Sequence, residues 1–380
     1  MTETILTNAR VVTRDAELAG TVVVRGDAIA AVDAGRSDAP GAVDLDGDYL
    51  LPGLVELHTD NLEKYLGPRP GVRWPAEAAL VAHDLQIVGS GITTVFDAVT
   101  VGEVIPGTHR LQSLGVTAKG LGAARGAGML KADHFLHMRM EVSYPEVVEL
   151  FLPFLDEPLV RLVSLMDHTP GQRQFADESK YRLYYQSKYH IDDAEYDRFS
   201  AHRKELAATY SARHRRRLVE LCRGKGWPVA SHDDATVDHV DESLAHGMTI
   251  AEFPTTIAAA EASHGAGMRV LMGAPNVVRG GSHSGNVSAA DLVSRGVVDI
   301  LSSDYYPQSL LHAAFLLASP AIGLALPEAV ATVSATPAAA VGLDDRGAIA
   351  VGRRADLVRV RPVNGVPLVR GVWRDGERIA

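Results

Sequence analysis

Eight short apolar segments recur along the middle of this 380-residue chain, and they constrain its fold more than any other feature. Each is rich in aliphatic and β-branched residues, and the stretches between most of them are long enough for a helix. Near-continuous apolar strands that alternate with helices are typical of a parallel sheet covered on both faces, and eight such units predict a (β/α)8 TIM-type barrel of the α/β class. The segments are GLVELHTDN, GITTVFDAVT, HMRMEVS, VRLVSLMDHTP, WPVASHDDAT, MTIAEFPTT, RVLMGAPNVV and VVDILSSDYYP.

The two ends of the chain have a different pattern. Residues 1–52 and 346–380 contain short β-rich runs separated by Gly and Asp turns. Since neither end can bury a sheet face alone, the sequence predicts one small β-sandwich domain assembled from both termini. The barrel domain then occupies residues 53–345.

The charge balance excludes some classes of partner. The chain has 37 basic and 47 acidic residues and a net charge of -10, which argues against non-specific binding to nucleic acid or to an anionic membrane surface. Three prolines interrupt the most apolar region, residues 311–343, which therefore predicts short packed helices and no membrane span. A small-molecule substrate is the expected partner, and a homo-oligomer is compatible with these features.

The expected location is the cytoplasm. Cys222 is the single cysteine, so no intramolecular disulfide can form, which suits a reducing compartment. The first residues, MTETILTNAR, lack the basic segment and apolar run of a secretory signal.

Most of the predicted strands become polar where they end. In a barrel the carboxyl ends of the strands form the active-site face. Side chains alternate along a strand, so His58 and Asp60 point to the same side. Asp97 and Glu252 are weaker candidates, because Asp97 could cap the following segment and Glu252 could shape a turn. The candidate metal ligands are His58, Asp60, Glu141, His168, His232 and Asp304.

This set of residue types indicates a metal-dependent hydrolase. A single histidine at a strand end is usually a hydrogen-bonded structural residue, but here imidazoles and carboxylates recur at the same end of successive strands. A ring of carboxylates repels itself unless cations occupy it. Imidazole and carboxylate ligands suit divalent zinc, which we favour, and also manganese, iron or nickel. Two such ions would activate a water molecule for hydrolysis.

Two loops are rich in hydrogen-bond donors and predict a highly charged substrate. The segment at residues 61–75 is basic and stiffened by prolines, and the segment at residues 274–286 is rich in glycine and small polar residues. Free backbone amides and arginines bind phosphate oxygens well, although the second loop could also be a mobile stretch of small residues. The candidate substrate-binding residues are Lys64, Arg69, Arg73, Arg279, Ser282, His283 and Asn286.

Two further segments have less specific interpretations. Residues 179–189 could form a lid or could be exposed to solvent. The run RHRRR at residues 213–217 predicts the solvated face of a helix that leads to Cys222, and that cysteine is expected to be buried and inert.

The combination of a two-ended β domain, a barrel, a His-x-Asp strand and a last-strand aspartate resembles the amidohydrolase superfamily. Within it, eight segments resemble the members of the carbon-phosphorus lyase pathway that act as diphosphatases. This resemblance implies hydrolysis of a ribose 5-triphosphate that carries a 1-phosphonate, to the 5-phosphate and diphosphate. The segments are HTDNLEKY, PRPGVRWP, GITTVFDA, LHMRMEVS, SLMDHTPGQRQF, SHDDAT, APNVVRGGSHSGN and SSDYYP.

The resemblance also implies roles for the candidate ligands. His58 and Asp60 would hold one ion, and His168 and His232 the other. Glu141 would bridge them, in place of the carboxylated lysine that many superfamily members use. The last-strand aspartate, Asp304, would orient the attacking water and accept its proton.

Two other functions are open at this point. One is a cyclic amide hydrolase of the dihydroorotase kind, which would share the metals but bind a small carboxylate substrate. The other is a non-catalytic scaffold in a phosphonate-degrading assembly. The basic loops at residues 61–75 and 274–286 favour a polyphosphate substrate, and the complete set of ligand residues argues against a scaffold.

Overall fold

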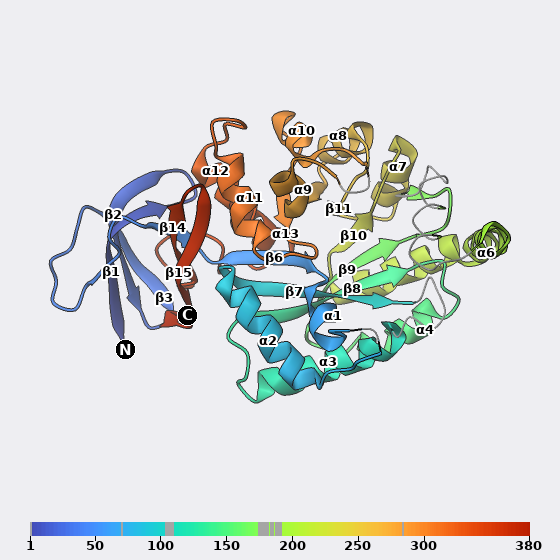
Figure 1. The fold of residues 1–380 in the computed structure, drawn as a ribbon, viewed down its shortest axis with the longest axis horizontal. Coiled ribbons are helices and arrows are strands. Elements are labelled where there is room, and N and C mark those ends of the chain that lie inside the picture. The colour runs from blue at the N-terminus through green and yellow to red at the C-terminus, as the bar shows by residue number, and fades with distance from the viewer. Residues whose placement is uncertain are drawn as a thin grey trace. The chain divides into compact units, whose positions relative to one another are not determined.

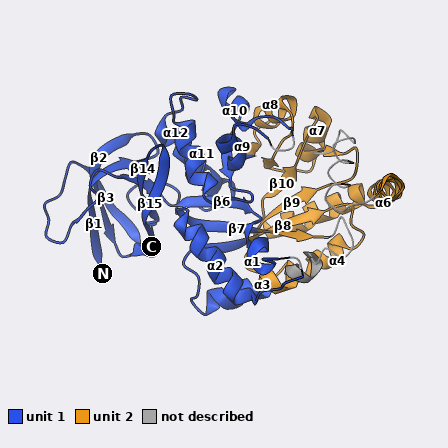
Figure 2. Cartoon of the chain, in the orientation of Figure 1, with its two compact units in different colours: residues 1–97, 119–135, 272–380 blue, residues 98–118, 136–271 orange. Residues whose placement is uncertain are grey.

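The computed structural model describes residues 2–69, 71–102, 110–173, 182, 186, 192–282 and 285–380. Figure 1 shows its ribbon. The chain divides into two compact units, which Figure 2 colours separately. The first unit comprises Met1–Asp97, Lys119–Phe135 and Met272–Ala380, and the second comprises Ala98–Ala118 and Leu136–Leu271.

Strands from both ends of the chain form one mixed sheet in the first unit (Figure 1). Its order is β16-β15-β14-β5-β1-β2-β3, with β4 paired to β1, and the antiparallel pairing of β14 with β5 joins the two ends. This confirms the prediction that both termini build one separate β sheet. The domain boundaries at residues 52 and 346 stay a prediction. The strands are β1 (Glu3–Val12), β2 (Glu17–Arg25), β3 (Ala28–Ala34), β4 (Val43–Asp44), β5 (Tyr49–Pro52), β14 (Leu357–Val363), β15 (Val366–Arg374) and β16 (Glu377–Arg378).

The core of this sheet draws on residues from both termini. Alternating positions of the strands face the same side, so short runs from distant parts of the chain can share one apolar face. The buried cluster contains Leu6, Ala9, Val11, Val22, Val24, Ile29, Leu45, Leu50, Ile349, Ala355, Leu357 and Trp373.

The second sheet has eight strands whose spatial order follows their order in the sequence, from β6 to β13. A parallel bridge between Thr59 and Asp304 joins the chain just after β13 to the end of β6, so the sheet is a nearly closed barrel. Each of the eight predicted segments overlaps one of these strands, which confirms the predicted fold. The strands are β6 (Leu54–Thr59), β7 (Ile92–Val101), β8 (Asp133–Glu141), β9 (Val160–Met166), β10 (Val229–His232), β11 (Ile250–Glu252), β12 (Arg269–Gly273) and β13 (Ile300–Ser302).

Helices follow most of the barrel strands, as a (β/α)8 fold requires. Short helices occupy the proline-interrupted region at residues 311–343, as predicted. The helices are α1 (Asn61–Leu66), α2 (Ala76–Gly89), α3 (Arg110–Gly126), α4 (Val147–Phe151), the 3-10 helix η1 (Leu152–Phe154), α6 (Asp193–Lys225), α7 (Val237–Ala245), α8 (Ile257–Gly265), α9 (Ala274–Arg279), α10 (Ala289–Ser294), α11 (Ser309–Leu317), α12 (Leu326–Ala331) and α13 (Ala335–Ala340).

Helix α6 is 33 residues long and has clear local signals at both ends. At its start the Asp192 side chain accepts from the backbone N–H of Glu195, whose own side chain accepts from the backbone N–H of Asp192. At its end Gly226 has a φ of 69°, a left-handed conformation that glycine adopts without a Cβ penalty. Within this helix the prediction for residues 213–217 was wrong in part, because His214 and Arg215 are buried.

Among the residues that the structure describes, no helix is both long enough and apolar enough to cross a membrane.

Candidate metal centre

The first candidate group, in the first unit, consists of His58, Asp60 and Asp304. Strand β6 is buried along its whole length and ends in this polar sequence. The His58 Nε2 atom lies 3.7 Å from Asp60 Oδ1, and one donor atom from each of the three residues lies within 4.8 Å of the others. Three residues predicted as ligands therefore come together from two parts of the chain more than 240 residues apart.

Backbone hydrogen bonds hold this group in place. The Asp60 N–H donates to the Asp304 carbonyl at 2.7 Å, and the Asp304 N–H donates to the His58 carbonyl at 3.0 Å. Asp304 has a φ of 54°, a left-handed conformation that a residue with a side chain rarely adopts. Such strain persists only where the surroundings enforce it, and it is common at functional sites. Here it directs the Asp304 carboxylate toward the end of β6.

Glu56 supports the same group and was missed by the sequence analysis. Its buried carboxylate accepts from the backbone N–H of His58 at 2.7 Å and from that of Ser303 at 2.6 Å. Burial raises the pKa of Glu56 to about 7, against the lowering effect of its hydrogen bonds with Ser303 and His58. Its position two residues before His58 was the only available signal, because strand alternation puts both side chains on one face.

The second candidate group, in the second unit, consists of His168, His232 and Asp233. One donor atom from each lies within 4.8 Å of the others, and the two imidazole centroids are 6.0 Å apart. The His232 Nδ1 atom lies 2.7 Å from Asp233 Oδ2. Asp233 has a φ of 59°, so a left-handed residue follows this strand too. The structure thus brings two predicted ligands, His168 and His232, together with a neighbouring carboxylate.

Glu141, at the end of β8, contacts His168 directly. Its Oε2 lies 2.7 Å from His168 Nδ1, and its Oε1 accepts from Ser143 Oγ at 2.5 Å and from Arg203 Nη2 at 3.0 Å. Burial alone would raise the pKa of Glu141, but the nearby His168 and Arg203 lower it to about 2. These contacts give Glu141 the role of orienting His168. The prediction that it bridges two ions stays a prediction.

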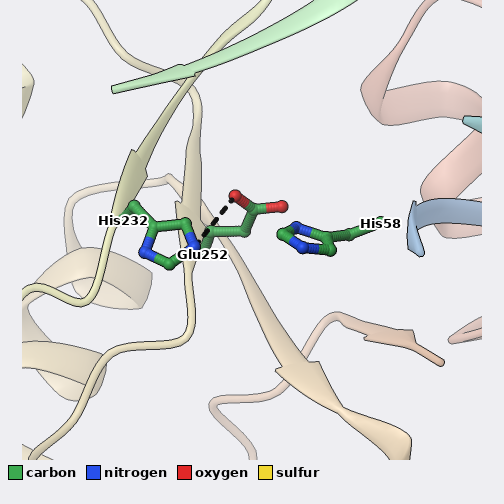
Figure 3. A group of neighbouring side chains, drawn as sticks. All are labelled: His58, His232 and Glu252. Atoms are coloured by element: carbon green, nitrogen blue, oxygen red, sulfur yellow. Dashed lines mark ion pairs between the residues drawn. The ribbon is translucent and has the colours of Figure 1, made fainter. Parts of the chain in front are cut away.

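Two further polar side chains lie beside His232. Arg139 Nη2 lies 3.4 Å from His232 Nε2. The buried Glu252 carboxylate lies 4.0 Å from the same His232 nitrogen and 3.8 Å from His137 Nδ1. Figure 3 draws the ion pair of His232 with Glu252, and it also draws His58, the histidine of the first group. Glu252 therefore lies beside a candidate ligand, whereas Arg139 was not predicted.

Asp97, a weaker candidate ligand, belongs to a separate buried cluster in the first unit. It lies 2.7 Å from His83 Nε2 and 2.7 Å from His134 Nδ1, and His134 Nε2 lies 3.1 Å from Asp84. Burial would raise the pKa of Asp97, but His134 and His83 lower it. Burial would lower the pKa of His134, but Asp97 and Asp84 raise it to about 9. Direct hydrogen bonds thus connect these groups. We interpret the cluster as structural.

The predicted substrate-binding residues before the first long helix are largely exposed. Lys64 donates from Nζ to the Tyr305 carbonyl, so the start of this segment is held against the chain that follows β13. Arg69 and Arg73 are exposed. Both arginine side chains are therefore accessible to a substrate, as the prediction requires.

The second predicted loop begins on α9. Arg279 ends this helix and is exposed, while Ser282 and Asn286 are half-buried. His283 lies outside the described residues. Asn276 shapes this loop: its Nδ2 donates to the Val287 carbonyl at 3.1 Å and its Oδ1 accepts from the Ala289 N–H at 2.9 Å.

The predicted lid at residues 179–189 lies outside the described residues except for Arg182 and Gln186. Arg182 pairs with Asp193 at 2.9 Å and with Asp197, both on α6.

The donor atoms of both candidate groups fit a divalent metal ion. The first group offers one imidazole nitrogen and two carboxylate oxygens, and the second offers two imidazole nitrogens and one carboxylate oxygen. Mixed imidazole and carboxylate sets suit zinc and the other divalent transition metals. Each group could therefore hold an ion.

Comparison with known proteins gives consistent matches. The sequence profile of the amidohydrolase family matches residues 160–380. The chain is 48% identical over 376 residues to alpha-D-ribose 1-methylphosphonate 5-triphosphate diphosphatase of Escherichia coli strain K12, and the alignment covers 99% of this chain and 100% of that protein.

Solved structures share the fold at low sequence identity. N-acetylglucosamine-6-phosphate deacetylase from Pasteurella multocida has a TM-score of 0.65 and 15% identity, with 100% of both chains covered. The corresponding enzyme from Mycobacterium smegmatis has a TM-score of 0.66 and 19% identity, covering 99% of this chain and 100% of that one. The 5-methylcytosine deaminase from Klebsiella pneumoniae has a TM-score of 0.65 and 18% identity, covering 100% of this chain and 98% of that one. At these identities the likeness supports the barrel fold alone.

Proposed function

The chain belongs to the amidohydrolase family, and from this premise we propose that it hydrolyses alpha-D-ribose 1-methylphosphonate 5-triphosphate to the 5-phosphate and diphosphate. The observation that carries the proposal is the 48% identity to a diphosphatase over nearly the whole of both chains. Two features agree with a charged phosphate substrate. They are the histidines and carboxylates that could bind a metal ion, and the exposed basic residues of the two loops.

We propose two ions, with zinc favoured over manganese, iron or nickel. His58, Asp60 and Asp304 would hold one ion, and His168 and His232 would hold the other. Each group lies at or just after the carboxyl ends of barrel strands, where the active-site face of such a barrel forms. Bound there, divalent ions act as Lewis acids and lower the pKa of a coordinated water.

The residues of the chain supply the remaining steps. A water oxygen forms a bond to the α-phosphorus, and the bond from that phosphorus to the oxygen it shares with the β-phosphorus breaks. Asp304 accepts the proton of the attacking water. Its left-handed backbone conformation holds the carboxylate in position for this role. Arg279 and the basic residues Lys64, Arg69 and Arg73 bind the phosphoryl oxygens, and Ser282, His283 and Asn286 offer further polar contacts. The diphosphate then leaves without a covalent intermediate on the protein.

The domain division and the location are also proposals. We propose that residues 1–52 and 346–380 form the β domain, that residues 53–345 form the catalytic barrel, and that the enzyme works in the cytoplasm. The separate terminal sheet and the single buried cysteine support these statements.

The proposed reaction is tested by incubating metal-loaded protein with the ribose triphosphate phosphonate. Diphosphate should form in amounts equal to the 5-phosphate product. An Asp304→Asn variant should lose most turnover, because its amide cannot accept the proton. Release of orthophosphate without diphosphate, or full turnover by this variant, would contradict the proposal. No cleavage of the phosphoanhydride bonds of the triphosphate, together with ring opening of a cyclic amide, would favour the dihydroorotase-like alternative, and no turnover of either substrate would favour a scaffold.

A further inference from the structure

Helix α6 presents a buried polar face to the ends of β8 and β9. Its Ser211 Oγ donates to Asp167 at 2.8 Å, and its His214 Nδ1 donates to the Val142 carbonyl at 3.1 Å. Asp167 directly follows β9 and precedes His168, and Val142 directly follows Glu141. One long helix thus contacts both the segment that carries His168 and the segment that carries Glu141.

Arg203, on the same helix, contacts the candidate ligand Glu141 itself. Its Nη2 donates to Glu141 Oε1 at 3.0 Å and to Ser143 Oγ at 2.7 Å. Arg203 is 2% exposed and Glu141 is 0% exposed, so this ion pair is shielded from water. Taking two charges out of water costs several kcal/mol per ion, and losing one partner leaves the other uncompensated. Arg203 therefore holds the Glu141 carboxylate in this position.

The hydrogen bonds of Glu141 then determine the tautomer of His168. Arg203 and Ser143 donate to Oε1, so the carboxylate is an acceptor throughout. Its Oε2 lies 2.7 Å from His168 Nδ1, which must carry the proton in this contact. The remaining nitrogen, Nε2, then holds the lone pair that a metal ligand needs. The backbone N–H of His168 also donates to Oε1 at 3.2 Å, which fixes the segment as well as the ring.

One nitrogen of the Arg203 guanidinium makes both contacts. Within the described part of the chain, the buried Arg203 Nε has no hydrogen-bond partner. An unsatisfied buried donor costs about 1–3 kcal/mol. The Nη2 contacts to Glu141 and Ser143 thus place the guanidinium, and Nε adds no hydrogen bond to them.

We propose that Arg203 is a positioning residue of the metal centre: it fixes the Glu141 carboxylate, and through it the His168 ring, in the form that binds a divalent ion. This inference rests on the ligand role of His168 in the proposed function. It does not depend on which substrate is hydrolysed.

The test compares Arg203→Met and Arg203→Lys with the matched control Arg216→Met. Arg216 lies on the same helix and is exposed. Zinc affinity of the full-length protein is measured by competition with a chelator, without substrate. Outer-shell substitutions typically cost 10–100-fold in metal affinity, so we expect a loss of roughly that size for Arg203→Met, a smaller loss for Arg203→Lys, and none for Arg216→Met.

A second readout is independent of metal and of activity. In metal-free protein labelled with nitrogen-15 histidine, His168 should show the Nδ1-protonated tautomer, identified by comparison with a His168→Gln variant. Arg203→Lys, which keeps the charge and is expected to fold, should shift His168 toward a mixture of tautomers. The inference would be overturned if Arg203→Lys kept both the zinc affinity and the His168 tautomer of the wild type. It would also be overturned if the control Arg216→Met lost as much zinc affinity as Arg203→Met. Because neither readout uses substrate, failure of the proposed hydrolysis would be seen separately.

Discussion

Replacing His134 with glutamine should remove a pH-dependent contribution to stability. The Nδ1 of His134 lies 2.7 Å from Asp97 and its Nε2 lies 3.1 Å from Asp84, and all three side chains are buried. Asp84 itself accepts from the backbone N–H groups of Lys131 and Ala132, each at 2.9 Å. Both nitrogens of His134 therefore donate to carboxylates, and only the imidazolium form can do so.

The size of this contribution follows from the pKa of His134. Burial alone would lower it, but the two carboxylates raise it from the ordinary 6.5 to about 9. Each pKa unit corresponds to about 1.4 kcal/mol, so protonation of His134 contributes about 3 kcal/mol to the free energy of unfolding. Because the pKa in the folded protein is raised, this stabilisation is fully present below pH 6.5 and is lost as the pH rises through about 9.

The assay is urea unfolding of metal-stripped wild-type protein and His134→Gln over this pH range. The difference in free energy of unfolding between the two proteins should shrink by about 3 kcal/mol as the pH rises from below 6.5 to above 9. His202→Gln is the control, because His202 is exposed on α6 and should give a difference near zero throughout. A difference between wild type and His134→Gln that does not change with pH would show that the folded protein holds no extra proton there, and would refute the argument.

Three other perturbations follow from the structure. Gly53→Ala should destabilise the protein by about 1–3 kcal/mol in urea unfolding, because a Cβ at this position would lie 2.3 Å from Thr93 Oγ1; Gly89→Ala, where a Cβ meets nothing within 4 Å, should not destabilise it. Arg279→Ala should leave the unfolding free energy within about 0.5 kcal/mol of wild type, because the side chain is exposed, yet should raise KM for the triphosphate in steady-state kinetics; an unchanged KM would remove Arg279 from the substrate site. Burial raises the pKa of Cys222 to about 12, so iodoacetamide at neutral pH should label it only after unfolding, as mass spectrometry would show; rapid labelling of native protein would contradict its burial.

The barrel and part of the candidate site were predictable because they depend on local patterns. An apolar strand is recognisable from a few consecutive residues, and strand alternation places His58 and Asp60 on one face. The carboxyl ends of parallel strands meet at one face, so Asp304 could be grouped with His58 without any contact being known. The structure brings these three residues together, and it also brings His168 close to His232.

The residues that support the candidate ligands could not be predicted in this way. Glu56 contacts the Ser303 N–H across 247 positions of sequence, and Arg203 contacts Glu141 across 62. In the sequence Arg203 is one of many charged residues on a polar helix, and the equally charged run at residues 213–217 predicted only a solvated face. No local signal separates a buried arginine from an exposed one on such a helix.

By itself, the sequence determined the strand pattern, the polar residues that end most of the strands and the chemistry that imidazole and carboxylate groups can perform. These are properties of single residues and of short repeats, so they can be recognised without knowledge of distant contacts. The tertiary structure decided which charges are buried and what each carboxylate contacts: Glu141 pairs with Arg203 and His168, and Asp97 pairs with His83 and His134. The physical reason is that the energy of a charge depends on its surroundings, and in a folded chain those surroundings come mainly from residues far away in sequence.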